Sequence, residues 1–259
     1  MTKRDRILFG AAVGILVLCE IAGRLFRFDA LWFPMAETIL TRLIGAAVFI
    51  VLIRRMGYRL LGSPDLRRHR AVPLLSLLVA VNNFPWIGLF TGRARIDASG
   101  GTILLFACEC IAVGLFEELA FRGFLLPYCL TLTRGRRRAV LLASVLSSSV
   151  FALVHLVNLF SGASPGAVVM QIGYSFLIGG MCACVLLASR SVWPCAAIHA
   201  VYNFCGTVVP RLGVGNGWDP VTITVTVLLG IFTASVLLRF LWMTDDRETD
   251  FLFTPSQTN

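Results

Sequence analysis

Residues 134–160 read RGRRRAVLLASVLSSSVFALVHLVNLF, and this stretch decides which kind of fold the chain can adopt. Four arginines within five positions are followed by 22 residues that include no lysine, arginine, aspartate or glutamate. A helix needs about 20 mainly apolar residues to cross the hydrocarbon core of a bilayer. The stretch therefore predicts a transmembrane helix that follows a cationic loop.

Similar apolar blocks recur along the whole chain, which is 57% hydrophobic and only 14% charged. A soluble domain is roughly 45–50% apolar and about 25% charged. We therefore predict an all-α, polytopic transmembrane helical bundle of about eight spans. The predicted spans are residues 7–26, 36–53, 71–91, 102–121, 139–160, 166–188, 192–209 and 220–242. Arg42 interrupts the second span, and the third carries Asn82, Asn83 and Pro85, so either is expected to be tilted, kinked or partly re-entrant. Seven spans is the alternative.

The cations are distributed unequally between the two sides of this predicted bundle. The chain has 23 Lys and Arg against 14 Asp and Glu, a formal net charge of +9. With the N-terminus inside, 15 of the cations lie in cytoplasmic segments and five on the opposite side. The positive-inside rule then predicts that both termini are cytoplasmic. We expect the lipid bilayer, and not nucleic acid, to be the partner of these cations.

The arginine bias and the compact length are typical of a bacterial protein, so we expect an integral protein of the bacterial inner (plasma) membrane. The first span is predicted to be an uncleaved anchor, because its apolar run is longer than that of a signal peptide.

The eight cysteines form no CxxC pair and are interpreted as small buried hydrophobic residues. A quinone-linked thiol oxidoreductase would need a reactive pair near an interface, which this spacing does not offer.

Polar side chains inside the predicted spans are the most informative feature for function. An ionisable group in a membrane helix costs at least a few kcal/mol and so requires a partner or a role. The polar residues are Glu20, Arg42, Glu109, Glu117, Glu118, Arg122, His155, His199 and Asn203. Glu109 is predicted to hydrogen-bond to Asn82 or Asn83, with a third functional carboxylate as the alternative. Glu20 and Arg42 receive no role.

The first pattern comprises Glu117, Glu118 and Arg122, at the end of the fourth predicted span. On a helix Glu118 and Arg122 are i,i+4 neighbours, so the arginine can hold one carboxylate ionised while Glu117 points about 100° away. Two adjacent carboxylates in different environments are suited to acid–base chemistry. The alternative is an ion pair that snorkels at a helix end.

Two further patterns place imidazoles in apolar helices. His155 follows Phe151 by one turn, and His199 shares a helix face with Asn203. Each alone is typical of a hydrogen-bonded core residue or of interhelical hydrogen-bond contacts. Together with the paired glutamates, these side chains can activate a water molecule and stabilise an oxyanion.

The order and spacing of EExxxR (Glu117, Glu118, Arg122), FxxxH (Phe151, His155) and HxxxN (His199, Asn203) resemble the CPBP family of intramembrane proteases. This family is also called the CAAX prenyl protease and bacteriocin-processing, or Abi, family. The resemblance implies a helical bundle with an intramembrane catalytic cavity and an endopeptidase that acts on a membrane-associated protein or peptide.

Carried over residue by residue, the resemblance implies a role for each motif position. Glu117 would be the general base that deprotonates water, and His155 would position that water. His199 and Asn203 would stabilise the tetrahedral oxyanion, with Glu118 and Arg122 as a supporting pair. The enzyme type stays open between glutamic protease and metalloendopeptidase; a divalent metal, zinc, would take its ligands from Glu117, His155, His199 and Asn203.

The depths predicted for the two histidines in the membrane conflict with this assignment. If the fifth span begins at Ala139, His155 lies about 24 Å along its helix, whereas His199 lies only about 10 Å along the seventh. A catalytic site therefore requires that the fifth span begin later or tilt strongly.

The resemblance divides the chain into four parts: spans one to three without a recognised motif (1–101), the CPBP-like core of spans four to seven (102–209), the eighth span (210–244) and a polar, disordered cytoplasmic tail (245–259). A non-catalytic membrane scaffold or immunity protein, or a proton-coupled transporter, is the alternative function. Transporters usually show repeated halves, which are not evident in this sequence.

Overall fold

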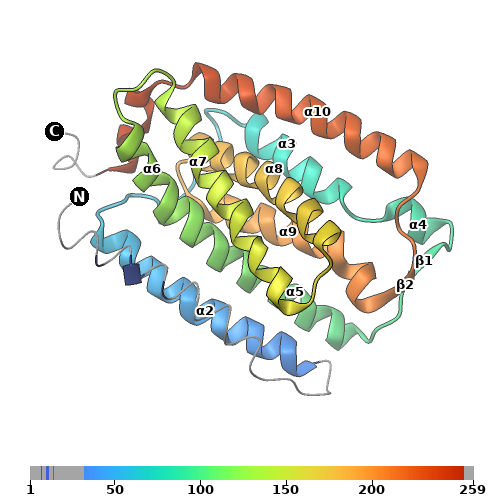
Figure 1. Cartoon of the computed structure of the whole chain (residues 1–259). Helices are drawn as coiled ribbons and strands as arrows, with labels where there is room; N and C mark the ends of the chain where they lie inside the picture. The colour runs from blue at the N-terminus through green and yellow to red at the C-terminus, as the bar shows by residue number, and fades with distance from the viewer. Residues whose placement is uncertain (1–6, 8–9, 12–13, 15–31, 254–259) are drawn as a thin grey trace.

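The computed structural model describes residues 7, 10–11, 14 and 32–253. The helices are α2 (Trp32–Arg55), α3 (Ala71–Asn82), α4 (Trp86–Phe90), α5 (Gly100–Glu118), the π-helix η1 (Leu119–Leu125), α6 (Leu126–Thr133), α7 (Ala139–Val154), the 3-10 helix η2 (His155–Ser161), α8 (Pro165–Ser189), α9 (Val192–Leu212), α10 (Pro220–Met243) and the 3-10 helix η3 (Asp246–Leu252). The long helices lie alongside one another in one bundle, with α2 and α10 on opposite sides (Figure 1).

The predicted all-α membrane fold is confirmed, because six helical segments of the described chain are long and apolar enough to cross a membrane. These six correspond to every predicted span except the first and the fourth. The fourth, residues 102–121, is present as α5 and the start of η1 and carries three glutamates. The first, residues 7–26, lies outside the described residues apart from a few positions. Arg42 does not break α2, since arginine is a good helix former.

Of the three alternatives for the third span, the structure shows the kink. α3 ends at Asn82, and the short α4 begins directly after Pro85, which cannot donate the backbone hydrogen bond that a continuous helix needs. Asn82 donates from Nδ2 to Oγ1 of Thr226 at 2.9 Å, and Asn83 donates to the carbonyl oxygen of Tyr202 at 3.2 Å. These two side chains therefore bind the kinked segment to α10 and α9.

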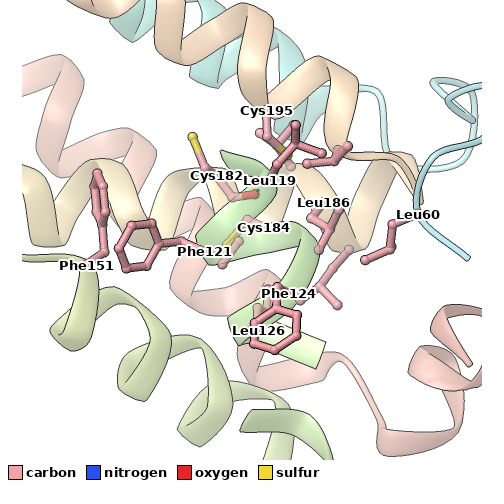
Figure 2. Packing of buried hydrophobic residues seen from close by; sticks show 14 of the residues in the cluster. Leu60, Leu119, Phe121, Phe124, Leu126, Phe151, Cys182, Cys184, Leu186 and Cys195 are labelled. Atoms are coloured by element: carbon pink, nitrogen blue, oxygen red, sulfur yellow. Dashed lines mark hydrogen bonds between the residues drawn. The ribbon is translucent and has the colours of Figure 1, made fainter. Parts of the chain in front are cut away.

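α5 occupies the centre of the packing. It contacts α2 and α9, while α7 packs against α6 and α8. The main hydrophobic core gathers around η1 and α8 and includes Leu119, Phe121, Phe124, Cys182, Cys184 and Cys195 (Figure 2). All seven described cysteines are free. Six are buried, which confirms their interpretation as small core residues, whereas Cys108 is exposed and Cys19 lies outside the described residues. This packing fixes the helix that carries the paired glutamates from two sides.

A short two-stranded ribbon connects α5 and α9, two of the helices that carry predicted site residues, at one end of the bundle. β1 (Ala94–Ile96) pairs antiparallel with β2 (Gly213–Gly215), with Ala94 opposite Gly215. Gly215 has a φ of +94°, and a Cβ there would collide with the carbonyl oxygen of Arg93, so this position requires glycine. The ribbon joins the loop before α5 to the end of α9.

The prediction of a disordered tail from residue 245 is wrong for the described part of this segment. η3 follows α10 directly and carries Leu252, which is completely buried. Phe253 is also buried, and its ring packs edge-on against Tyr58 with centroids 5.9 Å apart. The Arg59 amide donates to the carbonyl oxygen of Leu252 at 2.9 Å. Two apolar side chains thus anchor a segment whose composition is otherwise polar.

Ion pairs attach the same segment to two cationic loops. Arg68, between α2 and α3, lies 2.7 Å from Glu248, and Arg134, between α6 and α7, lies 2.9 Å from Asp250. The guanidinium of Arg190, between α8 and α9, lies 4.8 Å from the centre of the Phe251 ring. Three arginine-bearing connections therefore meet at one end of the bundle.

Candidate active site

The paired glutamates lie where α5 changes from an α-helix to a π-helix. α5 ends at Glu118 and η1 begins at the next residue. π-helical turns are rare and frequently occur at functional sites. The side chain of Glu118 is completely buried, whereas that of Glu117 is 20% exposed. The two carboxylates therefore have the different environments that the sequence predicts.

Arg122 holds one of these carboxylates in the protein interior. Its Nε lies 3.1 Å from Oε2 of Glu118, and both side chains are at most 1% exposed. Its guanidinium also lies over the Phe151 ring, 4.5 Å from the centroid. The predicted ion pair is present, and its burial excludes the alternative of a snorkelling pair at a helix end. Because both charges lie away from water, losing either one would leave the other uncompensated.

Gly179 of α8 provides the space that Arg122 occupies. A Cβ at Gly179 would lie 3.1 Å from Nη2 of Arg122 and 3.2 Å from the Cα of Ser148. Close packing by a small residue is common where membrane helices meet. Gly179 therefore lets α8 pack closely against Ser148 of α7 and leaves room for the arginine.

His199 bridges the two carboxylates. Its Nδ1 lies 2.6 Å from Oε1 of Glu118, and its Nε2 lies 3.5 Å from Oε2 of Glu117. The short contact indicates that Nδ1–H donates to the buried carboxylate, which fixes the orientation of the ring. Glu118 therefore holds two partners, Arg122 and His199, where the sequence predicts only the arginine.

His155 lies at the junction of α7 and η2. Its Nδ1 is 2.9 Å from the carbonyl oxygen of Phe151, and since a carbonyl can only accept, Nδ1 carries the proton. In the neutral imidazole this leaves Nε2 as an acceptor. The FxxxH spacing thus sets the tautomer of His155 through a backbone hydrogen bond.

The Phe151 ring lies against both histidines. Its centroid lies 5.2 Å from that of His155 and 5.9 Å from that of His199. α7 nevertheless begins at Ala139, so a later start of the helix is not the reason for this placement. Figure 1 shows α7 inclined relative to α2 and α10, so the two histidines meet although α7 begins early.

A cavity of about 160 Å³ opens beside these residues. Its lining residues are Arg42, Phe116, Glu117, Phe121, Phe151, Val154, His155, Val157, Asn158 and Gln171. A water molecule in the liquid occupies about 30 Å³, so the cavity can hold several waters or a short piece of peptide. Glu117 and His155 therefore face a common space, while Glu118 is sealed behind Arg122 and His199.

Asn203 is the one predicted site residue that the structure does not join to the others. It lies one helical turn after His199 on α9, is half-buried and is not among the residues that line the cavity. Its backbone oxygen accepts a hydrogen bond from Thr207. The other five residues form one connected cluster.

The four candidate metal ligands do not form a metal site as they are arranged. Among the residues that the structure describes, no three His, Cys, Asp or Glu side chains are grouped so that they could hold an ion. His199 uses Nδ1 for Glu118, and neither His199 nor Asn203 is among the residues that line the cavity. This donor arrangement differs from the three or four convergent ligands of a zinc site.

The prediction for Glu109 is wrong. Asn82 and Asn83 bond elsewhere, and Glu109 lies 3.3 Å from Nη2 of Arg211. This ion pair joins α5 to the end of α9, two turns from the paired glutamates. Its place next to the ribbon indicates a structural contact between the two helices.

Sequence reasoning did not place three polar residues in the cavity wall. The sequence analysis lists Arg42 among the intramembrane polar residues but gives it no role, whereas the structure places it in the cavity wall, on α2. Asn158 and Gln171 lie beyond the motifs, on η2 and α8. Asn158 could have been found, because it follows His155 by three residues in an otherwise apolar segment. Glu20 lies outside the described residues.

Comparison with known proteins bears directly on these helices. The family described as "Type II CAAX prenyl endopeptidase Rce1-like" matches residues 99–205, which include all six predicted site residues. No curated protein and no solved structure shows a significant match to the chain. The matched segment runs from the residue that caps α5 into α9. The segment that carries the site is therefore similar to the type II CAAX prenyl endopeptidases, in agreement with the resemblance that the three motifs indicate.

Proposed function

We propose that the protein is an intramembrane endopeptidase that hydrolyses a peptide bond of a membrane-associated protein or peptide through a glutamate-activated water. One observation carries the proposal: Glu117 and His155 line the same cavity, and the neighbouring Glu118 is buried in an ion pair and cannot take the same role. Two identical side chains thus have two separate functions.

In the proposed reaction, His155 accepts a hydrogen bond from the water through Nε2 and orients it. Glu117 removes a proton from this water while the oxygen attacks the scissile carbonyl carbon. The resulting oxyanion accepts hydrogen bonds from Nε2–H of His199 and from Asn203, whose side chain must turn toward the cavity when substrate binds. Glu117 then gives its proton to the leaving amine nitrogen as the C–N bond breaks.

The proposed mechanism requires a proton on both ring nitrogens of His199, because Nδ1–H donates to Glu118 and Nε2–H donates to the oxyanion. Both carboxylates contact this ring, Glu118 at Nδ1 and Glu117 at Nε2. These two acidic neighbours support the cationic form of the ring.

We further propose that the end of the bundle formed by the arginine-bearing connections faces the cytoplasm of a bacterial cell. The support is their position: Arg68, Arg134 and Arg190 all contact η3 and therefore lie at the same end. A cationic face of this kind suits the anionic inner leaflet.

The test is cleavage of a panel of membrane-tethered peptides by the purified protein in detergent. We expect Glu117→Gln to lower the cleavage rate by about 100-fold or more, because a positioned general base contributes roughly 10²–10⁴-fold. Glu109→Gln is the matched control, since it makes the same change on the same helix away from the cavity, and should keep most of the activity.

Three outcomes would contradict the proposal. Equal cleavage rates for Glu117→Gln and the parent protein would show that Glu117 is not the general base. Activity that a strong chelator abolishes and zinc restores would replace the glutamate-activated water by metal chemistry. Proton flux in proteoliposomes without cleavage of any peptide would favour the transporter instead.

A further inference from the structure

Two carboxamides on the cavity wall have no part in the proposed chemistry. Asn158 comes from η2 and Gln171 from α8, and Nδ2 of Asn158 donates to Oε1 of Gln171 at 2.8 Å. Both residues are half-buried, and both line the same cavity as Glu117. Most of the remaining wall is aromatic or aliphatic. A polar pair at such a place requires an explanation.

The pair keeps most of its hydrogen-bonding capacity after bonding to itself. Two carboxamides carry two carbonyl oxygens and four N–H groups, so one internal bond leaves one oxygen and three N–H groups. Within residues 32–253 neither side chain makes another hydrogen bond. A peptide unit offers one N–H and one C=O, so the free groups of the pair complement it. Satisfying these groups matters more in an apolar cavity than in water.

The position of Asn158 relative to His155 follows from the 3-10 geometry of η2. In a 3-10 helix, side chains at i and i+3 lie on the same side, and the rise is about 2.0 Å per residue. Asn158 therefore projects beside His155, about 6 Å further along the helix. An extended peptide advances about 3.3 Å per residue, so this distance corresponds to two residues of substrate.

We propose that the Asn158–Gln171 pair binds the main chain of an extended peptide substrate about two residues from the scissile bond. This inference rests on the proposed function and specifies how the substrate lies in the cavity. The pair recognises peptide N–H and C=O groups instead of a side chain, so it favours an unfolded segment and tolerates different sequences. It positions the scissile carbonyl beside Glu117 and His155.

The experiment combines two protein variants with a backbone change in the substrate. Asn158→Leu and Gln171→Met keep the approximate shape of the side chains and remove their hydrogen bonds. We expect each to lower kcat/KM about 10-fold, mainly through KM. Asn82→Leu is the matched control, because that carboxamide bonds to Thr226 outside the cavity, and it should leave KM unchanged.

A set of ester-containing peptides distinguishes substrate binding by the Asn158–Gln171 pair from a purely structural role of the pair. In each peptide one backbone amide is replaced by an ester, at positions up to three residues on either side of the scissile bond. The parent protein should cleave the ester two residues away at least fivefold more slowly than the amide, and the Gln171→Met variant should cleave both at similar rates. An ester effect that is the same in the parent and both variants at every position would overturn the inference.

Binding measurements separate a failure of this inference from a failure of the proposed function. Affinities of the same peptides for Glu117→Gln, measured by fluorescence anisotropy, require no cleavage. Discrimination against the ester without hydrolysis by the parent protein would preserve the peptide site and reject the protease. Hydrolysis without any discrimination would preserve the protease and reject the role of the pair. Neither binding nor hydrolysis would reject both.

Discussion

Replacing Gly114 by alanine adds one methyl group where α5 touches α9. A Cβ at this position would lie 2.8 Å from the carbonyl oxygen of Ala196 and 3.0 Å from the amide nitrogen of Ala200, whereas ordinary contacts begin at 3.4 Å. Both neighbours are backbone atoms, so no side chain can rotate away. The two helices must therefore move apart by about half an ångström.

This displacement acts on the site, because Gly114 lies one turn before Glu118 and the two alanines flank His199. The 2.6 Å bond between His199 and Glu118 would lengthen to about 3.1 Å, close to the limit of a good hydrogen bond. Overpacking costs about 1–3 kcal/mol, and alanine recovers about 1 kcal/mol over glycine in a helix. We expect a net loss of up to about 2 kcal/mol in stability and about a 10-fold loss of peptide cleavage.

Gly230→Ala in α10 is the control for this prediction, since a Cβ there would meet nothing within 4 Å. It should gain up to about 1 kcal/mol from helix propensity and leave cleavage unchanged. Thermal unfolding of both variants in the same detergent, with cleavage rates corrected for the folded fraction, provides the comparison. If Gly114→Ala were as stable and as active as Gly230→Ala, the close contact of α5 and α9 would not hold the site together.

Three other perturbations test separate parts of the structure. Arg122→Met should lower the free energy of unfolding by about 3–5 kcal/mol, because it leaves the Glu118 charge buried without a guanidinium. Adding Glu118→Gln should recover part of this loss. An Arg122→Met variant as stable as the parent would contradict the buried ion pair. Leu252→Ala should lower the free energy of unfolding by about 2–5 kcal/mol and make η3 accessible to proteases. An unchanged rate of proteolytic digestion would mean that Leu252 does not anchor η3. Asp219 caps α10, and the hydrogen bond from the Thr222 hydroxyl is the main reason why its pKa is lowered. The Asp219 carboxylate therefore contributes fully to stability above the ordinary carboxyl pKa of about 4, and this contribution is lost as the pH falls through the lowered pKa. The melting temperatures of the parent and of Asp219→Asn should accordingly converge in acid. Parallel pH profiles of the two melting temperatures would contradict the role of Asp219 as a cap.

The spans and the Glu118–Arg122 pair were predictable because both depend on local geometry. An apolar stretch of about 20 residues determines a membrane helix, and i,i+4 spacing on a helix brings two side chains together whatever the rest of the chain does. The kink at Pro85 belongs to the same group, since proline removes a backbone donor wherever it occurs. Such features need no knowledge of which helices are neighbours.

The incorrect or missing predictions all depend on which helices pack together. Glu118 meets His199 across 81 positions, and Glu109 meets Arg211 across 102, so no local spacing reports either contact. The disordered tail was predicted from its polar composition, which conceals the single buried leucine at 252. The change from α to 3-10 helix at His155, which brings Asn158 beside it, leaves no mark in the hydrophobic pattern.

η3 also has a consequence for the order in which the bundle is completed during synthesis. Domains generally begin to fold from the N-terminus while the chain is still growing. η3 is translated after all three connections that it contacts, so those connections must wait for it with their arginines uncovered. Until then the half-made protein presents an open, cationic end, where quality-control proteases and chaperones can distinguish a chain interrupted before Leu252 from one that has passed this residue.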